Sequence, residues 1–375
     1  MTWAPAPEQA AYYSIPAPSD TRSAFLDLLP FSPADPTRGR EALPRSPDEE
    51  AIRSCHQHRD GKVYLDAAKK EWVSYQVWEP KDGSTQREAD LFFIHGINDY
   101  GGKFSMHAER FLSAGYRVIV PDLPSHGRST GIHVHCPSME ALADAVYEVI
   151  KDVLLQDSKI VQEAGGSYTQ NRKVFVAGQS LGGFTAAYTC LFVIFIARDV
   201  SKKYGAPVDT DLPVSESFRP TVHGGIILCP MIAISPQTRP PYIIELFARL
   251  ISSFASSLPL AAANKGKNSE DPTVEEQFNM DPQTYHGRLR VGTGLGILQG
   301  LIDVNAKMSH LKVPFLLCHG TGDRVTSYHG SEKLYKEASS TDKYEHILLR
   351  KGRDAADDAR RQNVLGDMLD WLNRH

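Results

Sequence analysis

A serine between two glycines is the first feature of the sequence that could do chemistry. It stands in Gly178-Gln179-Ser180-Leu181-Gly182, which follows the apolar run "KVFVAG" and opens a helix-like run. In this setting the G-x-S-x-G pattern predicts a sharp turn from strand to helix that projects the serine hydroxyl. The N-terminus of the following helix directs backbone N–H groups at developing negative charge. We therefore interpret Ser180 as a nucleophile.

A nucleophilic serine needs a base, and the base needs an acid that orients it. Asp323 in "CHGTGDRV" directly follows the last clear apolar run, so we expect a loop to present it beside Ser180. The alternative is an aspartate that only shapes a turn. Three histidines come later in the chain. His329 follows Asp323 too closely and His375 ends the chain, which leaves His346 in "KYEHILL" as the best candidate base.

Two backbone N–H groups should hold the oxyanion that forms during acyl transfer. One is the N–H of Leu181, directly after the proposed nucleophile. The other should come from the loop after "LFFIHG", where Ile97 is our candidate and Gly96 gives the backbone room to turn. We interpret His95, in the same loop, as a brace of that loop rather than as a catalytic group.

The elements that must position these residues are short apolar runs that alternate with helical patterns. Five runs are typical of buried parallel strands, and they lie at 91–96, 116–122, 173–178, 224–230 and 313–320. The stretch 71–80 alternates as a half-buried strand does. One face of 138–155 is apolar, Ser138 can cap its start, and a further amphipathic helix closes the chain. Strands that alternate with helices predict a mostly parallel sheet covered on both faces.

One long segment interrupts this alternation. More than eighty residues separate "ILCP" from "VPFLL", too many for a simple crossover. Within them 241–260 places apolar residues on one helical stripe: Ile243, Phe247, Leu250, Phe254 and Leu258, with Leu246 and Ile251 beside it. Such a helix is either a cap buried on the core or a lid over an apolar substrate. We expect this cap or lid insertion at about 231–280.

Composition narrows the class of protein. Of the 375 residues 41% are hydrophobic and 23% are charged, as in ordinary globular proteins, and a net charge of −4 offers no basic face for nucleic acid. Five widely spaced cysteines and the lack of a secretory pattern favour a cytoplasmic protein. Nine of the 24 prolines lie in the first fifty residues, which predicts a flexible arm over 1–58 ahead of a domain at 59–375.

Several stretches together resemble the monoacylglycerol lipase branch of the α/β-hydrolases, which also holds lysophospholipase-like and serine-aminopeptidase-like members. They are "IHGINDYGG", "PDLPSHGRSTG", "GQSLGG", "ILCPMI", "DPQTYHG" and "VPFLLCHGTGDRV". The resemblance runs from about Gly61 to the end of the chain. It implies an α/β-hydrolase fold with an inserted helical lid, and structural roles for Asp122 and His126. The histidines and cysteines at 55–58 and 133–136 lack spaced partner pairs, and no metal or organic cofactor is implied.

For the active site, the resemblance implies a triad of Ser180, Asp323 and His346 with oxyanion donors at Ile97 and Leu181. The implied reaction is hydrolysis of a lipid carboxylic ester, above all a monoacylglycerol, through an acyl-enzyme. General carboxylesterase and lysophospholipase activities are the alternatives. The lid implies peripheral contact with membranes or lipid droplets.

One departure from the family pattern concerns the base. Only 23 residues separate Asp323 from His346, so we expect the strand before His346 to be shortened or absent. If His346 is displaced, the same pocket would bind a lipid without turning it over.

Overall fold

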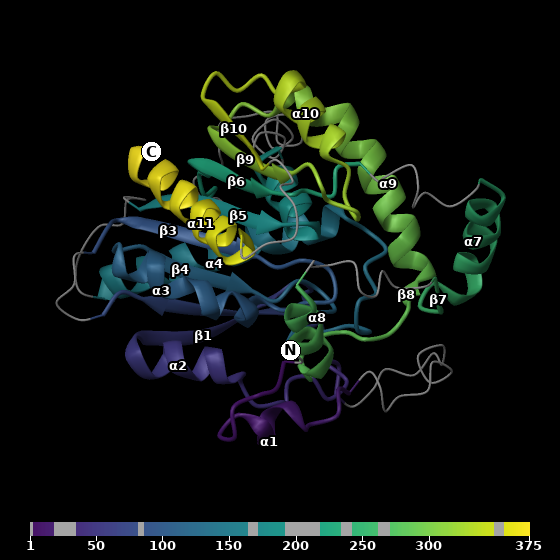
Figure 1. Ribbon diagram of the computed structural model, residues 1–375, viewed down its shortest axis with the longest axis horizontal. Helices are drawn as coiled ribbons and strands as arrows, with labels where there is room; N and C mark the ends of the chain where they lie inside the picture. The colour runs from purple at the N-terminus through teal and green to yellow at the C-terminus, as the bar shows by residue number, and fades with distance from the viewer. Residues whose placement is uncertain are drawn as a thin grey trace.

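An eight-stranded sheet forms the centre of the computed structural model, which describes residues 3–18, 35–81, 86–163, 172–191, 218–233, 242–261, 271–348 and 356–375 (Figure 1). The strand order is β1-β2-β4-β3-β5-β6-β9-β10. β2 runs antiparallel to both neighbours, and all other neighbours are parallel. The predicted mostly parallel sheet is confirmed. The strands are β1 (Gln57–Tyr64), β2 (Trp72–Glu79), β3 (Ala89–Ile94), β4 (Arg117–Pro121), β5 (Lys173–Gln179), β6 (Gly224–Leu228), β9 (Phe315–Gly320) and β10 (Lys343–Leu348).

Burial explains why the apolar runs form the middle of the sheet. Every residue of β3 and of β4 is buried, as expected for strands covered on both faces. The prediction of a half-buried strand at 71–80 is wrong in this respect, because all of β2 except its two end residues is buried. Both of its neighbours in the sheet and the helices on either face cover it.

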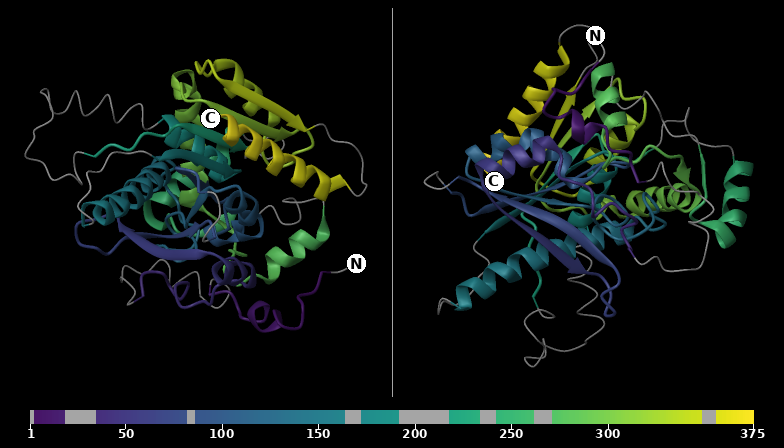
Figure 2. Two further views of the ribbon diagram at one scale, coloured as in Figure 1. Left: turned by 90° about the vertical axis from the view of Figure 1, so that its left-hand side faces the viewer. Right: turned by 90° about the horizontal axis from the view of Figure 1, so that it is seen from below.

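Helices cover the sheet on two faces (Figures 1 and 2). Apolar residues of α4 (Glu140–Glu163), of the helix 181–191 and of α9 (Val291–Lys307) share one core with the strands. A second core lies under α2 (Pro47–Cys55), α3 (Ser105–Ser113) and α11 (Ala356–Arg374). The remaining short helices are α1 (Ala10–Tyr13), η2 (Gly101–Phe104), η3 (Met308–His310) and α10 (Tyr328–Glu337). The predicted cap of α4 is confirmed, since Ser138 accepts a hydrogen bond from the N–H of Ala141 at 3.1 Å.

The expected insertion lies between β6 and β9. It contains α7 (Tyr242–Ala255), β7 (Pro259–Ala261) and α8 (Pro272–Met280), followed by β8 (Leu289–Arg290), which pairs with β7. α7 stands at the periphery, away from the sheet (Figures 1 and 2).

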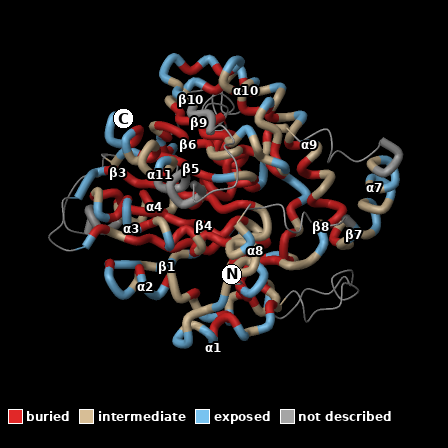
Figure 3. The backbone as a smooth tube through the Cα atoms, viewed as in Figure 1, coloured by how far each residue is buried: buried red, intermediate tan, exposed pale blue. Residues whose placement is uncertain are grey.

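Four of the apolar residues predicted on α7 are open to solvent rather than buried (Figure 3). The exposed fractions are 56% for Leu246, 58% for Phe247, 62% for Leu250 and 88% for Phe254. The interpretation as a cap helix buried on the core is therefore wrong for these four residues. The side chain of Ile243 lies outside the described part of the structure. Among the helices described, none combines the length and apolarity needed to cross a bilayer.

The described parts of 1–58 pack onto the domain. Arg40 is buried, and its guanidinium donates to the carbonyl oxygens of Gly127, Ser129 and Gly131 at 2.6–3.0 Å. The expectation of a flexible arm therefore does not hold for the residues described, because buried hydrogen bonds fix them. α2 and the first residues of β1 also belong to this segment, so the expected boundary at residue 58 falls inside a strand of the sheet.

Candidate active site

Ser180 occupies the turn that the sequence predicts. It directly follows β5 and precedes the helix 181–191, it is half-buried, and its φ of +55° lies in the left-handed region. The Ser180 N–H donates to the carbonyl of Leu228 at 3.0 Å, and its carbonyl accepts from Met231 N–H at 3.0 Å. A non-glycine residue held in this conformation is strained, and such strain collects at functional sites. These two backbone hydrogen bonds, to the last residue of β6 and to the third residue after it, hold the strained turn in place.

The glycines of the motif are required by close backbone packing. A Cβ built on Gly178 would lie 2.3 Å from the carbonyl oxygen of Gly182. On Gly183 it would lie 2.7 Å from the carbonyl oxygen of Leu228. Both distances are shorter than any allowed contact, so the helix can start this close to the strands only without these side chains.

The loop after β3 lies against Ser180. β3 and β5 are neighbours, with Ile94 paired to Gly178, and a Cβ built on Gly96 would be 3.7 Å from the Cβ of Ser180. Leu181 is the first residue of its helix, so its N–H has no partner within the helix. This arrangement places the backbone of both predicted oxyanion donors, Ile97 and Leu181, next to the serine. Their role as donors remains a prediction.

His95 braces this loop, as predicted. Its Nε2 accepts a hydrogen bond from Leu123 N–H at 3.0 Å, and its Nδ1 lies 2.7 Å from the Gly96 carbonyl, which can only accept. The proton is therefore on Nδ1. Burial lowers the pKa of His95 to about 4, although the bond to Gly96 opposes this, so the ring is neutral near pH 7.

The structural roles expected for Asp122 and His126 are confirmed. The Asp122 carboxylate accepts from the N–H groups of Gly101 and Arg128, each at 2.8 Å. It thereby ties the loop after β4 to the segment after residues 95–99, which we call the oxyanion loop for their predicted role. His126 is fully buried, its Nδ1 lies 3.0 Å from the Pro124 carbonyl, and burial lowers its pKa well below the usual value.

Asp323 lies in the loop after β9, at the same edge of the sheet as Ser180. Its Oδ1 accepts from Val325 N–H at 2.7 Å and Thr326 N–H at 2.9 Å, and its Oδ2 accepts from the Thr326 hydroxyl at 2.7 Å. Burial raises the pKa of Asp323, but hydrogen bonds from His319, Thr326 and the two N–H groups outweigh it and lower the pKa to about 2. The group is an anion with a fixed orientation.

A histidine that the sequence pattern did not predict lies beside Asp323. His319 is buried, its Nε2 lies 3.5 Å from Asp323 Oδ2, and its Nδ1 lies 2.7 Å from the Ser331 hydroxyl on α10. The spacing of four residues in "HGTGD" was the available signal. Asp323 is therefore already in contact with one imidazole, at the end of β9.

His346 does not lie on a loop after the sheet. It is inside β10 and pairs with Cys318, which pairs with Leu228, which in turn pairs with Gln179. One row of residues thus crosses four strands and joins His346 to the residue before Ser180. Neighbouring strands are about 4.8 Å apart, so three steps put these α-carbons roughly 14 Å apart.

We expected the strand before His346 to be shortened or absent, and this is wrong. β10 is present, and His346 lies inside it rather than after it. The residues after the strand, 349–355, hold no histidine in the sequence and lie outside the described residues. The two histidines rejected from the sequence have partners elsewhere. His329 contacts Glu332 within α10, and His375 contacts Asp342.

Comparison with known proteins agrees with this arrangement. The model of the family described as "Serine aminopeptidase, S33" matches residues 85–193 and 214–350, more than half of the chain. The chain belongs to this family. It is an α/β-hydrolase of the monoacylglycerol lipase-like branch, as the sequence motifs implied.

Three similar proteins illustrate the breadth of this hydrolase family. The chain is 27% identical over 353 residues to caffeoylshikimate esterase of Arabidopsis thaliana, covering 91% of this chain and 93% of the relative. It is 23% identical over 305 residues to a monoacylglycerol lipase of Mycolicibacterium smegmatis, covering 81% and 93%. Its fold matches a soluble variant of monoglyceride lipase from Saccharomyces cerevisiae with a TM-score of 0.60, at 16% identity over 84% of this chain and 94% of that one.

Proposed function

We propose that this hydrolase cleaves carboxylic esters through an acyl-enzyme on Ser180. The Ser180 hydroxyl attacks the ester carbonyl, and the N–H groups of Ile97 and Leu181 stabilise the oxyanion. His346, oriented by Asp323, would have to leave its place inside β10 to remove the serine proton, and it then returns this proton to the departing alcohol. Water then hydrolyses the acyl-enzyme. The observation that carries the proposal is the left-handed Ser180, at the end of β5 and in contact distance of the Gly96 loop.

We propose a lipid ester, most of all a monoacylglycerol, as the substrate. Two observations support this choice. The relatives include a protein named monoacylglycerol lipase, and α7 in the insertion presents an apolar surface at Leu246, Phe247, Leu250 and Phe254. We propose that α7 is part of a lid and makes peripheral contact with membranes or lipid droplets. Lysophospholipids and general carboxylic esters are the alternative substrates, and the Arabidopsis relative is named for caffeoylshikimate.

A second candidate function, lipid binding without turnover, is favoured by the position of His346. An imidazole that accepts a proton from serine must lie within hydrogen-bond reach of it. The row from Gln179 to His346 spans three strand spacings. For His346 to act as the base, β10 would need a different register that moves the histidine beyond the end of the strand.

The decisive experiment compares substrates and variants of the purified protein. Hydrolysis of a medium-chain monoacylglycerol, a lysophospholipid, a short-chain ester and a hydroxycinnamoyl ester is measured together with labelling by a fluorophosphonate. Turnover and labelling that disappear in Ser180→Ala establish the esterase, and the fastest substrate identifies its class. A folded protein that binds monoacylglycerol but shows neither turnover nor labelling supports the second candidate.

Two histidine variants then test the base. If His346 is the base, His346→Ala loses about a hundredfold or more in rate, whereas His329→Ala, an exposed histidine on α10, retains the activity of the natural chain. Equal activity of the two variants would remove His346 from the mechanism while leaving the Ser180 result intact.

A further inference from the structure

A buried carboxylate, Asp281, lies where three distant segments of the chain meet. Asp281 directly follows α8 and is completely buried. Its Oδ1 accepts hydrogen bonds from the Tyr12 hydroxyl at 2.8 Å and from Gln283 N–H at 3.1 Å. Its Oδ2 accepts from the Tyr100 hydroxyl at 3.0 Å and from the Lys103 ammonium at 2.8 Å. Four donors satisfy both oxygens, as burial of a charge requires.

The first segment that reaches Asp281 is the N-terminal arm. Tyr12 and Tyr13 of α1 are both buried, and their rings pack edge to face with centroids 5.0 Å apart. The Tyr12 hydroxyl also accepts from Gln283 Nε2 at 2.9 Å. The backbone N–H of Trp3 donates to Glu276 on α8. The arm therefore docks against α8 and the residues that follow it.

The second segment is the chain directly after the oxyanion loop. Tyr100 and Lys103 lie three and six residues after Ile97, and both donate to Asp281. Burial lowers the pKa of Lys103, but the Asp281 and Asp99 carboxylates raise it by more, so the ammonium is charged in the contact. The loop itself is also held, since Tyr285 N–H donates to the Asn98 carbonyl at 2.8 Å. Asn98 is the residue after Ile97, and its φ of +68° is strained.

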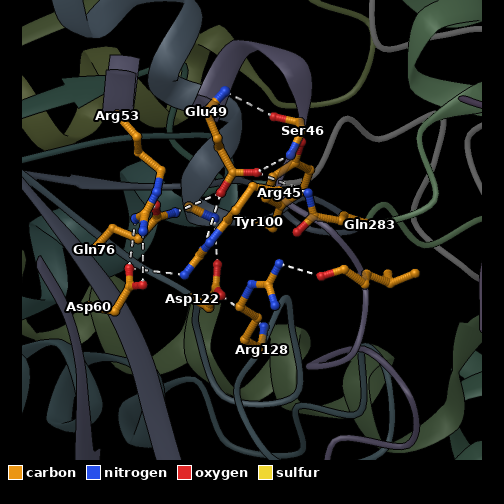
Figure 4. A network of polar contacts seen from close by, with 12 residues as sticks. Arg45, Ser46, Glu49, Arg53, Asp60, Gln76, Tyr100, Asp122, Arg128 and Gln283 are labelled. Carbon is orange, nitrogen blue, oxygen red and sulfur yellow. Dashed lines mark hydrogen bonds and ion pairs between the residues drawn. The ribbon is translucent and has the colours of Figure 1, made fainter. Parts of the chain in front are cut away.

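A second buried carboxylate extends the contact toward the sheet. Gln283 Nε2 donates to Glu49 Oε2 at 3.0 Å, and Gln76 of β2 donates to Glu49 Oε1 at 2.7 Å. Figure 4 shows Glu49 between Arg45, Ser46, Gln76 and Gln283, with Tyr100 close by. A Cβ built on Gly102 would lie 2.1 Å from Glu49 Oε1, so the segment after the oxyanion loop is packed directly against this carboxylate.

From this geometry we infer that Asp281 is a positioning residue for the oxyanion loop, and that the N-terminal arm supplies part of its support through Tyr12. The inference rests on the proposed ester hydrolysis for its kinetic consequence. The arm donates a hydrogen bond to Oδ1 of Asp281, and the segment after the oxyanion loop donates to Oδ2. A change in how the arm docks therefore alters the position of the backbone around Ile97. An enzyme that loses this support binds substrate but stabilises the transition state poorly.

The test uses the full-length chain with Tyr12→Phe, which removes one hydroxyl donor to Asp281, and Asp281→Asn. Tyr13→Phe is the matched control, because the Tyr13 hydroxyl contacts Gln277 rather than Asp281. Hydrogen exchange at the amides of 96–104 is followed by mass spectrometry, and kcat and KM are measured with a monoacylglycerol. We expect exchange in 96–104 to rise several-fold in Tyr12→Phe and more in Asp281→Asn, while Tyr13→Phe matches the natural chain. We expect kcat to fall by about tenfold in Tyr12→Phe with KM changed far less.

Each result decides between the alternatives. Equal exchange at 96–104 in Tyr12→Phe and Tyr13→Phe overturns the inference, whether or not Asp281→Asn folds. A rise in KM with an unchanged kcat also overturns it, because the contact would then serve substrate binding. If exchange rises as expected while the natural chain hydrolyses no ester, the support of the loop stands and the proposed function fails.

Discussion

Gly182 lies against the carbonyl oxygen of Ile94, so closely that a Cβ on Gly182 would be 2.1 Å from it. This contact brings the first turn of the helix 181–191 onto the end of β3. Leu181 precedes Gly182 in the helix, and Ile97 follows Ile94 in the loop after β3. The two predicted oxyanion donors therefore lie on the two segments that this contact joins. The second glycine of the motif therefore fixes the spacing between two segments of backbone, in addition to making room for Ser180.

Substitution of Gly182 by alanine should destabilise the protein. The new methyl group meets backbone that cannot move aside, and overpacking of this kind costs about 1–3 kcal/mol. Gly294→Ala on α9 is the matched control, because its Cβ would meet only the Leu289 side chain at 3.7 Å. There alanine should stabilise by about 0.5–1 kcal/mol through helix propensity. Urea unfolding measures both variants, and a loss of stability in both would contradict the argument.

The strain at Ser180 gives a second prediction. Glycine adopts a φ near +55° freely, whereas alanine does not. Ser180→Gly should therefore be more stable than Ser180→Ala by about 1 kcal/mol, although both variants lack the hydroxyl. The denaturation midpoints of the two proteins are compared directly. Identical midpoints would mean that the backbone relaxes in the alanine variant and that the turn stores no strain.

Asp323 should make the free energy of unfolding depend on pH below about pH 5. Its pKa is about 2 in the folded protein, below the ordinary aspartate value of 3.8. A lowered carboxyl pKa contributes stability above the unfolded value, and this contribution disappears as the pH falls through the folded value. The advantage of the natural chain over Asp323→Asn should shrink by about 2 kcal/mol between pH 5 and pH 2. Urea unfolding at several pH values measures it, and a constant difference would refute the assignment.

Arg40 should contribute strongly to the docking of the N-terminal arm on the domain. Arg40→Met keeps the apolar stem but removes the donors to three carbonyl oxygens, those of Gly127, Ser129 and Gly131. Loss of hydrogen bonds to a charged, buried group costs about 1.5–3 kcal/mol, and unpaired carbonyls add to this. Arg219→Met, at an exposed arginine, should change the stability by less than about 0.5 kcal/mol. If thermal melting of the two variants coincides, Arg40 contributes no net stability to arm docking.

Because apolar residues of α7 are exposed, we expect substitutions there to weaken binding to lipid without changing the free energy of unfolding. The double variant Leu250→Ser with Phe254→Ser should unfold like the natural chain, since both side chains are largely exposed. Binding to phosphatidylcholine vesicles should fall by about thirtyfold or more, because roughly 2–3 kcal/mol of apolar burial disappears. Ile302→Ser, at an exposed apolar residue on α9, is the control. Unchanged vesicle binding would show that α7 does not face lipid.

The strands and the nucleophile turn were predictable because their signals are local. Apolar runs such as 91–96 and 173–178 report strands buried on both faces, and Gly178-x-Ser180-x-Gly182 reports a strained turn in five residues. Asp323 was placed correctly after β9 for a similar reason, since a turn of "GTGD" must follow the strand. In each case the residues that determine the conformation are adjacent in the chain.

The contacts that the sequence could not predict join distant segments. Nothing in the proline-rich stretch around Arg40 predicts a contact of its guanidinium with Ser129, which lies 89 positions later in the chain. The register of β10 depends on its pairing with β9, and the six residues of β10 do not by themselves define where the strand begins relative to its neighbour. For this reason the sequence did not predict that His346 lies inside β10 rather than after it.

The distance along the chain between Tyr12 and Asp281, 269 residues, has a consequence for biosynthesis. The ribosome makes Tyr12 long before it makes Asp281, the buried carboxylate against which the arm docks. Trp3, Tyr12 and Tyr13 therefore remain without their native partners on α8 and at Asp281 until that segment is made, a state that favours aggregation. We expect arm docking to be among the last steps of assembly, because it must wait for a segment that is synthesised 269 residues later.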